Sequence, residues 1–223
     1  MHRQHVSSET VDTRRRKTID IATGLVLVFI GMTGAVAGIL ISAIADRDEI
    51  AQLIADDVIQ TEGIRDAAAI ELLYGLLLWG GYGLTAASAI ILIGAIIFTI
   101  ARWRSYRRGT VEGSLYTDGV VGAVITSVTS FLPFAPLIGG LVAGFLYRGD
   151  GWRGATVGVV VGILVMLPVV VFGAVLAFGY IQHELFVASL GVVFVVVVTA
   201  MVTLVFAAVG GYIGGYLRAE HGK

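Results

Sequence analysis

Long apolar runs separated by short polar stretches dominate this chain. Hydrophobic segments cover about residues 18–45, 72–101, 154–181 and 186–217. Each is longer than the roughly 20 residues that a helix needs to cross a bilayer. A fifth apolar region, residues 117–147, contains two of the three prolines. The pattern predicts an all-α fold, a polytopic transmembrane helical bundle with five to six membrane segments.

The fifth apolar region predicts a helical hairpin broken by proline. As one straight helix, residues 117–147 would be about 46 Å long, against a hydrocarbon core of about 30 Å. Pro133 and Pro136 stand midway, and each removes a backbone donor and disfavours helix at the residue before it. A break at these prolines leaves two short arms. The arms either span fully or form a re-entrant hairpin, which is tolerated only when it is buried in protein or lines a cavity.

Polar stretches divide the chain into predicted parts. Residues 1–17 show no hydrophobic periodicity and predict a disordered cytoplasmic tail. Residues 18–108 predict a two-span unit with an acidic extracellular connection at 46–71. That connection has apolar residues at helical spacing, so we expect an amphipathic helix on the membrane surface. Residues 109–116 predict a linker, and residues 117–223 a glycine-rich membrane domain of four segments.

Basic residues predict the orientation in the membrane. If residues 117–147 double back, 13 of the 15 lysine and arginine residues lie on one side of the bilayer; a single crossing would leave nine there. The positive-inside rule favours the first arrangement. We therefore expect a multi-pass protein of the cell membrane with both termini cytoplasmic. Two clusters flank the first two spans and are predicted topology signals and contacts for anionic lipid: Arg14, Arg15, Arg16 and Lys17, then Arg102, Arg104, Arg107 and Arg108.

Glycine recurs at intervals of four residues along several spans. Small residues at that spacing lie on one helix face and let two backbones approach closely, as in a glycine zipper. The predicted helix-packing residues are Gly34, Gly38, Gly140, Gly144, Gly154, Gly158, Gly162, Gly211 and Gly215.

The amino-acid composition limits the kinds of partner and site that this chain can have. The chain is 57% hydrophobic and only 14% charged, and its net charge of −1 suggests no nucleic-acid partner. The absence of cysteine excludes disulfides, thiolate metal sites and cysteine nucleophiles. The middles of the spans hold no ionisable residue, which argues against a proton-coupled pump. We assign no catalytic, cofactor-binding or metal-binding residue and expect that the protein is not an enzyme.

The glycine-rich region also contains a partial internal repeat and is similar to another kind of membrane domain. Residues 139–146 match residues 210–217 at four positions, which indicates either duplication or the same packing need met twice. Residues 133–162 resemble an uncharacterised membrane domain common in haloarchaea, through the proline turn, the run from Gly139 to Leu146, and the helix start from Gly154 to Gly158. The resemblance covers roughly residues 117–217 and implies four membrane segments and no assigned activity. Arginine outnumbers lysine 13 to two, which also fits a salt-loving archaeon.

Two functional hypotheses follow. The first is a non-enzymatic membrane component built for helix packing or oligomer formation, whose partners are the lipid bilayer and a second copy or another membrane protein. The alternative is a channel or transporter for a small solute or ion that uses the re-entrant turn at Pro133 and Pro136. A hydroxyl-lined cavity that reaches residues 130–136 would favour the alternative.

Overall fold

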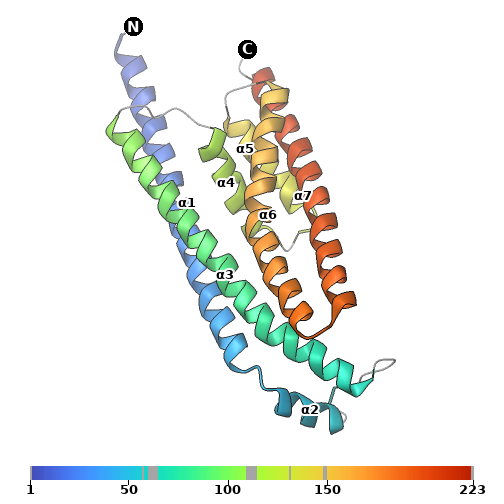
Figure 1. Cartoon of the computed structure of the whole chain (residues 1–223). Coiled ribbons are helices and arrows are strands. Elements are labelled where there is room, and N and C mark those ends of the chain that lie inside the picture. Colours follow the sequence, from blue (N-terminus) through green and yellow to red (C-terminus); the bar gives the residue numbers. More distant parts are fainter. Residues whose placement is uncertain are drawn as a thin grey trace. The chain divides into compact units, whose positions relative to one another are not determined.

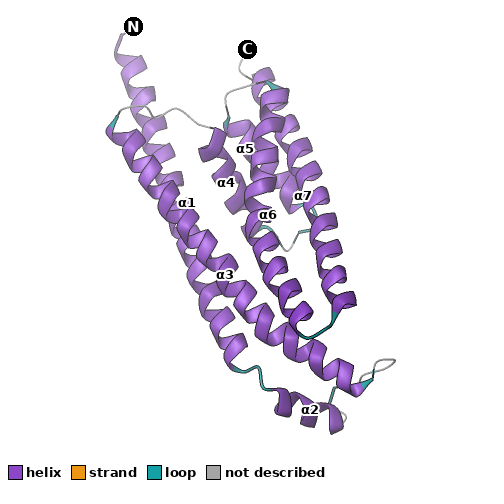
Figure 2. Cartoon of the chain, in the orientation of Figure 1, coloured by secondary structure: helices purple, strands orange, loops and turns teal. Residues whose placement is uncertain are grey.

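The computed structural model describes residues 2–56, 58–59, 65–108, 115–130, 132–147 and 150–221, with side chains between residues 17 and 220. These residues form seven helices and no strand (Figure 2). The helices are α1 (His2–Ala43), α2 (Arg47–Ala55), α3 (Asp66–Arg107), α4 (Leu115–Val128), α5 (Ala135–Leu146), α6 (Gly151–Gln182) and α7 (Phe186–His221). The predicted all-α class is confirmed.

Four of the helices are long and apolar enough to cross a membrane. The candidate spans are Lys17–Ala43 in α1, Asp66–Arg107 in α3, Gly151–Gln182 in α6 and Phe186–Glu220 in α7. Each coincides with one of the four long hydrophobic runs of the sequence. The chain is therefore a multi-pass membrane protein by the length and composition of its helices.

The predicted break in the fifth apolar region is confirmed. Figure 1 shows α4 and α5 as two short helices joined by a turn. Helix α4 ends at Val128 and α5 begins at Ala135, and Pro136 falls in the first turn of α5, where the missing N–H has no helical partner to lose. With 14 and 12 residues, the arms are about 21 and 18 Å long. Neither arm alone reaches across the roughly 30 Å of the hydrocarbon core.

The N-terminal helix is longer than the sequence predicted. Helix α1 begins at His2, within the residues 1–17 for which we expected disorder. No glycine or proline interrupts residues 2–17. Once the apolar span is helical, each further residue extends the helix without a new nucleation cost, so the helix continues into the polar segment.

Contacts divide the chain into two compact units. Unit 1 comprises Met1–Ile30, Ile91–Met166 and Ala200–Lys223, and unit 2 comprises Gly31–Ile90 and Leu167–Thr199. The long helices α1, α3, α6 and α7 contribute a segment to each unit, whereas α4 and α5 belong to unit 1 and α2 to unit 2. Each unit thus combines pieces from both sides of the predicted linker at 109–116, of which residues 109–114 lie outside the described part of the chain.

In unit 2, α2 packs on its own protein. Ile50 and Ile54 are buried, and they form a small core with Ala69 of α3. The side chain of Asp46 caps the start of α2 by accepting a hydrogen bond of 2.8 Å from the backbone N–H of Asp48. Two residues of the apolar face of α2 are therefore covered by the chain itself, and the position of this helix at the membrane surface stays a prediction. Residues 57 and 60–64 of the acidic connection lie outside the described residues.

Candidate functional site: a glycine-packed helix junction

The most closely packed part of unit 1 lies where α5, the start of α6 and the end of α7 meet. Four side chains there have no exposed surface: Ala143 from α5, Val157 and Val161 from α6, and Ala207 from α7. We call this region the helix junction. It consists of α5, residues 151–166 of α6 and residues 200–221 of α7.

Helices α5 and α7 touch backbone to backbone at the junction. A Cβ atom added to Gly140 would collide with the carbonyl group of Ala207, and one added to Gly144 would collide with that of Gly211. From the other side, a Cβ on Gly214 would lie 2.8 Å from the backbone N of Phe145. Real Cβ atoms essentially never come this close to backbone atoms, so these positions accept only glycine without a shift of a helix.

Helix α6 approaches the same face of α7. A Cβ on Gly158 would lie 2.8 Å from the carbonyl carbon of Ala207, and a Cβ on Gly154 would lie 2.9 Å from the Cα of Gly215. Gly162 faces a side chain instead, that of Leu204, at 2.9 Å. A single small-residue face of α7 therefore receives two helices, which brings three backbones together.

The nine predicted packing glycines all meet another helix. Seven lie at the junction, as described. The other two lie in unit 2, where α1 meets α3: a Cβ on Gly34 would collide with the hydroxyl of Ser88, and one on Gly38 would lie 2.6 Å from the carbonyl oxygen of Gly81. Sequence reasoning did not select Gly122, Gly139, Gly210 and Gly214 as packing sites, although they are equally close to neighbouring backbone atoms.

The hydroxyl groups of α4 are used by the helix itself. Thr126 is buried, and its Oγ1 donates to the carbonyl of Gly122 at 3.0 Å. Ser127 donates to Ala123 at 2.9 Å, and Thr129 donates to Ile125 at 2.7 Å. Hydroxyl groups bonded to the carbonyl one turn back have no proton left to offer a passing solute.

A buried ion pair joins α1 to α3 in unit 1. The guanidinium of Arg102 donates from Nε to Oδ2 of Asp20 at 2.6 Å, and the Tyr106 hydroxyl donates to the same oxygen. Both charged side chains are more than nine-tenths buried. Sequence reasoning grouped Arg102 with the topology and lipid residues and did not single out Asp20. Arg102 points into the protein instead, because it neutralises Asp20.

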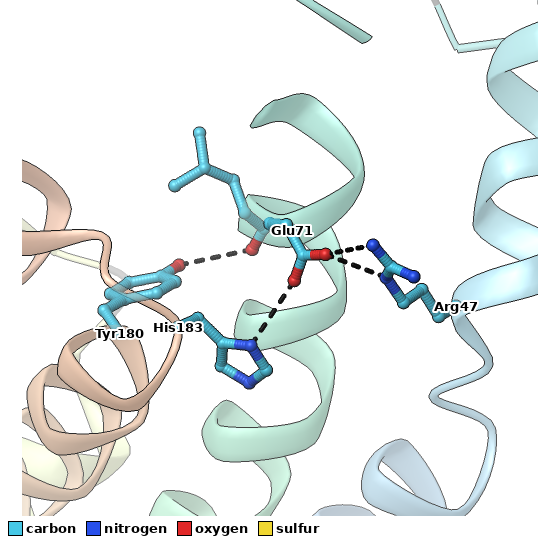
Figure 3. A network of polar contacts seen from close by, with 5 residues as sticks. Arg47, Glu71, Tyr180 and His183 are labelled. Carbon is cyan, nitrogen blue, oxygen red and sulfur yellow. Dashed lines mark hydrogen bonds and ion pairs between the residues drawn. The ribbon is translucent and has the colours of Figure 1, made fainter. Parts of the chain in front are cut away.

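Unit 2 has a second polar network, which centres on Glu71 of α3. Figure 3 shows its carboxylate between Arg47 on one side and His183 on the other. Arg47 donates from Nε to Oε1 at 2.8 Å, and Nδ1 of His183 lies 3.3 Å from Oε2. The Arg47 side chain is 60% exposed, so water screens this network, unlike the pair in unit 1. No sequence motif pointed to these residues, which come from three separate helical regions.

The remaining predicted topology residues lie within α1, just before its apolar span, and at or directly after the end of α3. Arg104, Arg107, Arg108 and Lys17 are exposed. Arg14, Arg15 and Arg16 belong to α1, but their side chains lie outside the described part of the structure. Among the described residues, no group of three His, Cys, Asp or Glu side chains is placed to hold a metal ion.

Comparison with known proteins covers one part of the chain. Residues 116–217 match the model of a family described as a family of unknown function, DUF5518. The matched residues coincide with the range of about 117–217 over which the sequence resembles an uncharacterised membrane domain. No curated protein matches the chain, and no solved structure matches it.

Proposed function

We propose that this protein is a non-enzymatic, multi-pass component of the cell membrane whose helix junction serves as a rigid packing core. The backbone contact of α5 and α6 with Ala207 and Gly211 of α7 carries the proposal. Close backbone approach gives van der Waals contact and room for Cα–H···O contacts inside lipid. The four fully buried side chains at the centre of the junction are alanine or valine, which are suited to packing and carry no acid, base or nucleophile.

The proposal places the packing within one chain. Each predicted packing glycine faces a helix of the same molecule, so these surfaces are already covered. A role in self-association or in binding another membrane protein would need a different surface. Gly94 and Gly191 are exposed, and a Cβ atom added to either of them would have no neighbouring atom within 4 Å.

Orientation with both termini in the cytoplasm is part of the proposal. Unit 1, which includes both termini, holds 13 of the 15 lysine and arginine residues, whereas unit 2 holds nine of the 16 carboxylate residues. The positive-inside rule favours a cytoplasmic location for the loops and tails that carry these basic residues. Because α4 and α5 are each too short to cross, a re-entrant hairpin with both ends on the cytoplasmic side agrees with that distribution.

Substitution at the junction tests the packing role. In Gly158→Leu a branched side chain would meet the backbone of Ala207, whereas in Gly94→Leu it would meet open space. Thermal unfolding of purified protein in detergent should show a large loss of stability for the first variant and little change for the second. Light scattering in the same detergent should give an unchanged molecular mass for Gly94→Leu. Equal stability of the two variants would remove the basis of the proposal.

Cysteine labelling tests the orientation, because the natural chain has no cysteine. In intact cells, a membrane-impermeant maleimide should label Asp48→Cys from outside and should reach Asp150→Cys only after lysis. Labelling of Asp150→Cys in intact cells would mean that residues 117–147 cross the membrane once.

The alternative function is passage of a small solute or ion past the turn at Pro133 and Pro136. The broken hairpin is the feature that favours it, since re-entrant segments line pathways in channels and transporters. The hydroxyl groups of Thr126, Ser127 and Thr129 donate to their own helix, so they could meet a solute or cation only through their oxygen lone pairs. Solute and ion flux into vesicles containing the purified protein, compared with protein-free vesicles, would decide between the two functions.

A further inference from the structure

The last two turns of α3 present two different faces. Arg102 and Tyr106 are one turn apart, and both reach Asp20 of α1. Trp103, Arg104, Arg107 and Arg108 lie on the other side of the helix and are exposed. The basic cluster that follows the second span is therefore divided into one internal arginine and three outward ones.

The outward face combines charge with an aromatic ring. The guanidinium carbon of Arg107 lies 4.0 Å from the centre of the Trp103 ring, one turn earlier on the helix. Stacking of this kind attracts the cation to the ring face and holds the flexible arginine in place. Trp103 remains 55% exposed, and tryptophan prefers the level of the lipid headgroups.

The three outward arginines carry uncompensated charge. Arg102 is neutralised by Asp20, but within the described part of the chain no carboxylate forms an ion pair with Arg104, Arg107 or Arg108. They follow directly after the apolar run of α3 at residues 72–101. Three fixed positive charges at the end of a membrane span, beside an interfacial tryptophan, match the phosphate of an anionic lipid.

We propose that Trp103, Arg104, Arg107 and Arg108 form a binding site for the headgroup of an anionic phospholipid. The guanidinium groups would bind the phosphate oxygens, and the indole ring would rest against the upper part of the acyl chains. Arg102 has no part in this site, because its side chain is buried and paired with Asp20. The site is independent of the packing role proposed for the helix junction.

Fluorescence of Trp103 tests the proposal directly. The variant Trp79→Phe with Trp152→Phe retains Trp103 as its single tryptophan. In mixed micelles, brominated phosphatidylglycerol should quench this tryptophan at lower mole fraction than brominated phosphatidylcholine. Each basic residue near an anionic surface contributes a factor of about five to binding, so Arg107→Gln should reduce the preference for phosphatidylglycerol by about fivefold.

Controls separate a site from general attraction to negative charge. Arg65→Gln also removes one exposed arginine, but from unit 2, and it should leave the preference unchanged. Arg107→Lys should recover only part of it, because a lysine keeps the charge but lacks the planar fork. Native mass spectrometry of the natural chain should show retained phosphatidylglycerol, and inorganic phosphate at millimolar concentration should not displace it.

Equal quenching by the two brominated lipids would overturn the proposal, as would an equal loss of preference in Arg65→Gln and Arg107→Gln. Displacement by inorganic phosphate would also contradict it, since the ligand would then be a soluble anion. If Arg107→Gln yields no folded protein, Arg104→Gln tests the same face, and the lipid comparison on the natural chain still applies.

Discussion

Units 1 and 2 are assembled from segments of the same four long helices, yet they are held together differently. In unit 1 the closest contacts join backbone to backbone, and the main polar contact is a buried ion pair. In unit 2 backbone approaches backbone where α1 meets α3, at Gly38 and Gly81, but other glycines meet side chains, as Gly179 meets Trp79 and Gly75 meets Tyr180. The main polar network of unit 2 includes the exposed side chain of Arg47. The two units therefore differ in how much they can adjust to a substitution.

The difference arises because backbone contacts and side-chain contacts can adjust to a substitution to different degrees. A backbone carbonyl in a helix cannot move without moving the helix, whereas an aromatic side chain can shift by a few tenths of an ångström. Likewise, an exposed ion pair exchanges one set of partners for water at little cost, but a buried charge that loses its partner has no water to replace it. We expect the helix junction and the buried ion pair of unit 1 to be intolerant of small changes that the side-chain contacts and the exposed network of unit 2 accept.

The largest contrast should come from the two ion pairs. Asp20→Asn leaves the charge of Arg102 buried without a counter-charge, and loss of one partner of a buried pair costs about 3–5 kcal/mol. Arg47→Gln in the exposed network should cost less than about 1 kcal/mol. Unfolding of both variants in detergent, followed by circular dichroism, would measure the difference. Equal losses of stability would show that the two pairs are equally hydrated and would contradict the proposed difference between the units.

A single methyl group should show the next largest contrast. In Gly144→Ala the added Cβ meets the backbone of Gly211, and such overpacking costs about 1–3 kcal/mol. In Gly75→Ala the Cβ lies 3.0 Å from the ring of Tyr180, which can move, and alanine is favoured over glycine in helices by about 0.5–1 kcal/mol. Thermal unfolding should therefore separate the variants, with Gly75→Ala close to the natural protein. A neutral Gly144→Ala would mean that the junction yields as easily as unit 2.

The smallest effect should be a gain of stability in unit 2. Glu184 has a left-handed backbone conformation with φ of 59° at the end of α6. The N–H of Leu185 donates to the carbonyl of Tyr180 at 2.8 Å, and that of Glu184 donates to Ile181 at 3.1 Å. This pair of bonds is the helix ending in which glycine is most common. Glu184→Gly should raise stability by about 0.5–1 kcal/mol, whereas Glu184→Ala should give no such gain; a loss with glycine would contradict this account.

Much of the fold could be predicted from the sequence because its signals lie in consecutive residues. Hydrophobic length marked the four long helices, and Pro133 and Pro136 marked the break, since both depend on local chemistry alone. The four-residue glycine spacing selected residues that do meet other helices. Spacing identifies a face of a helix, however, and it does not say which helix covers that face.

What the sequence did not reveal depends on distant partners. Asp20 and Arg102 are 82 positions apart, and no sequence feature near either residue identifies the other as its partner. The apolar face of α2 has the same pattern whether lipid or Ala69 covers it, so the pattern alone does not identify Ala69 as the partner of Ile50 and Ile54. Glu71, Arg47 and His183 likewise come together only once three helical regions have folded.

The shortness of α4 and α5 has a consequence for how such chains can change over generations. In the re-entrant arrangement proposed above, the hairpin enters and leaves through the same face of the bilayer and adds no crossing. Insertion or deletion of the whole segment would leave every later helix pointing in its original direction, whereas gain or loss of a full span would invert them all. Chains of this kind can therefore acquire or lose buried contact area without reversing the exposure of their ends.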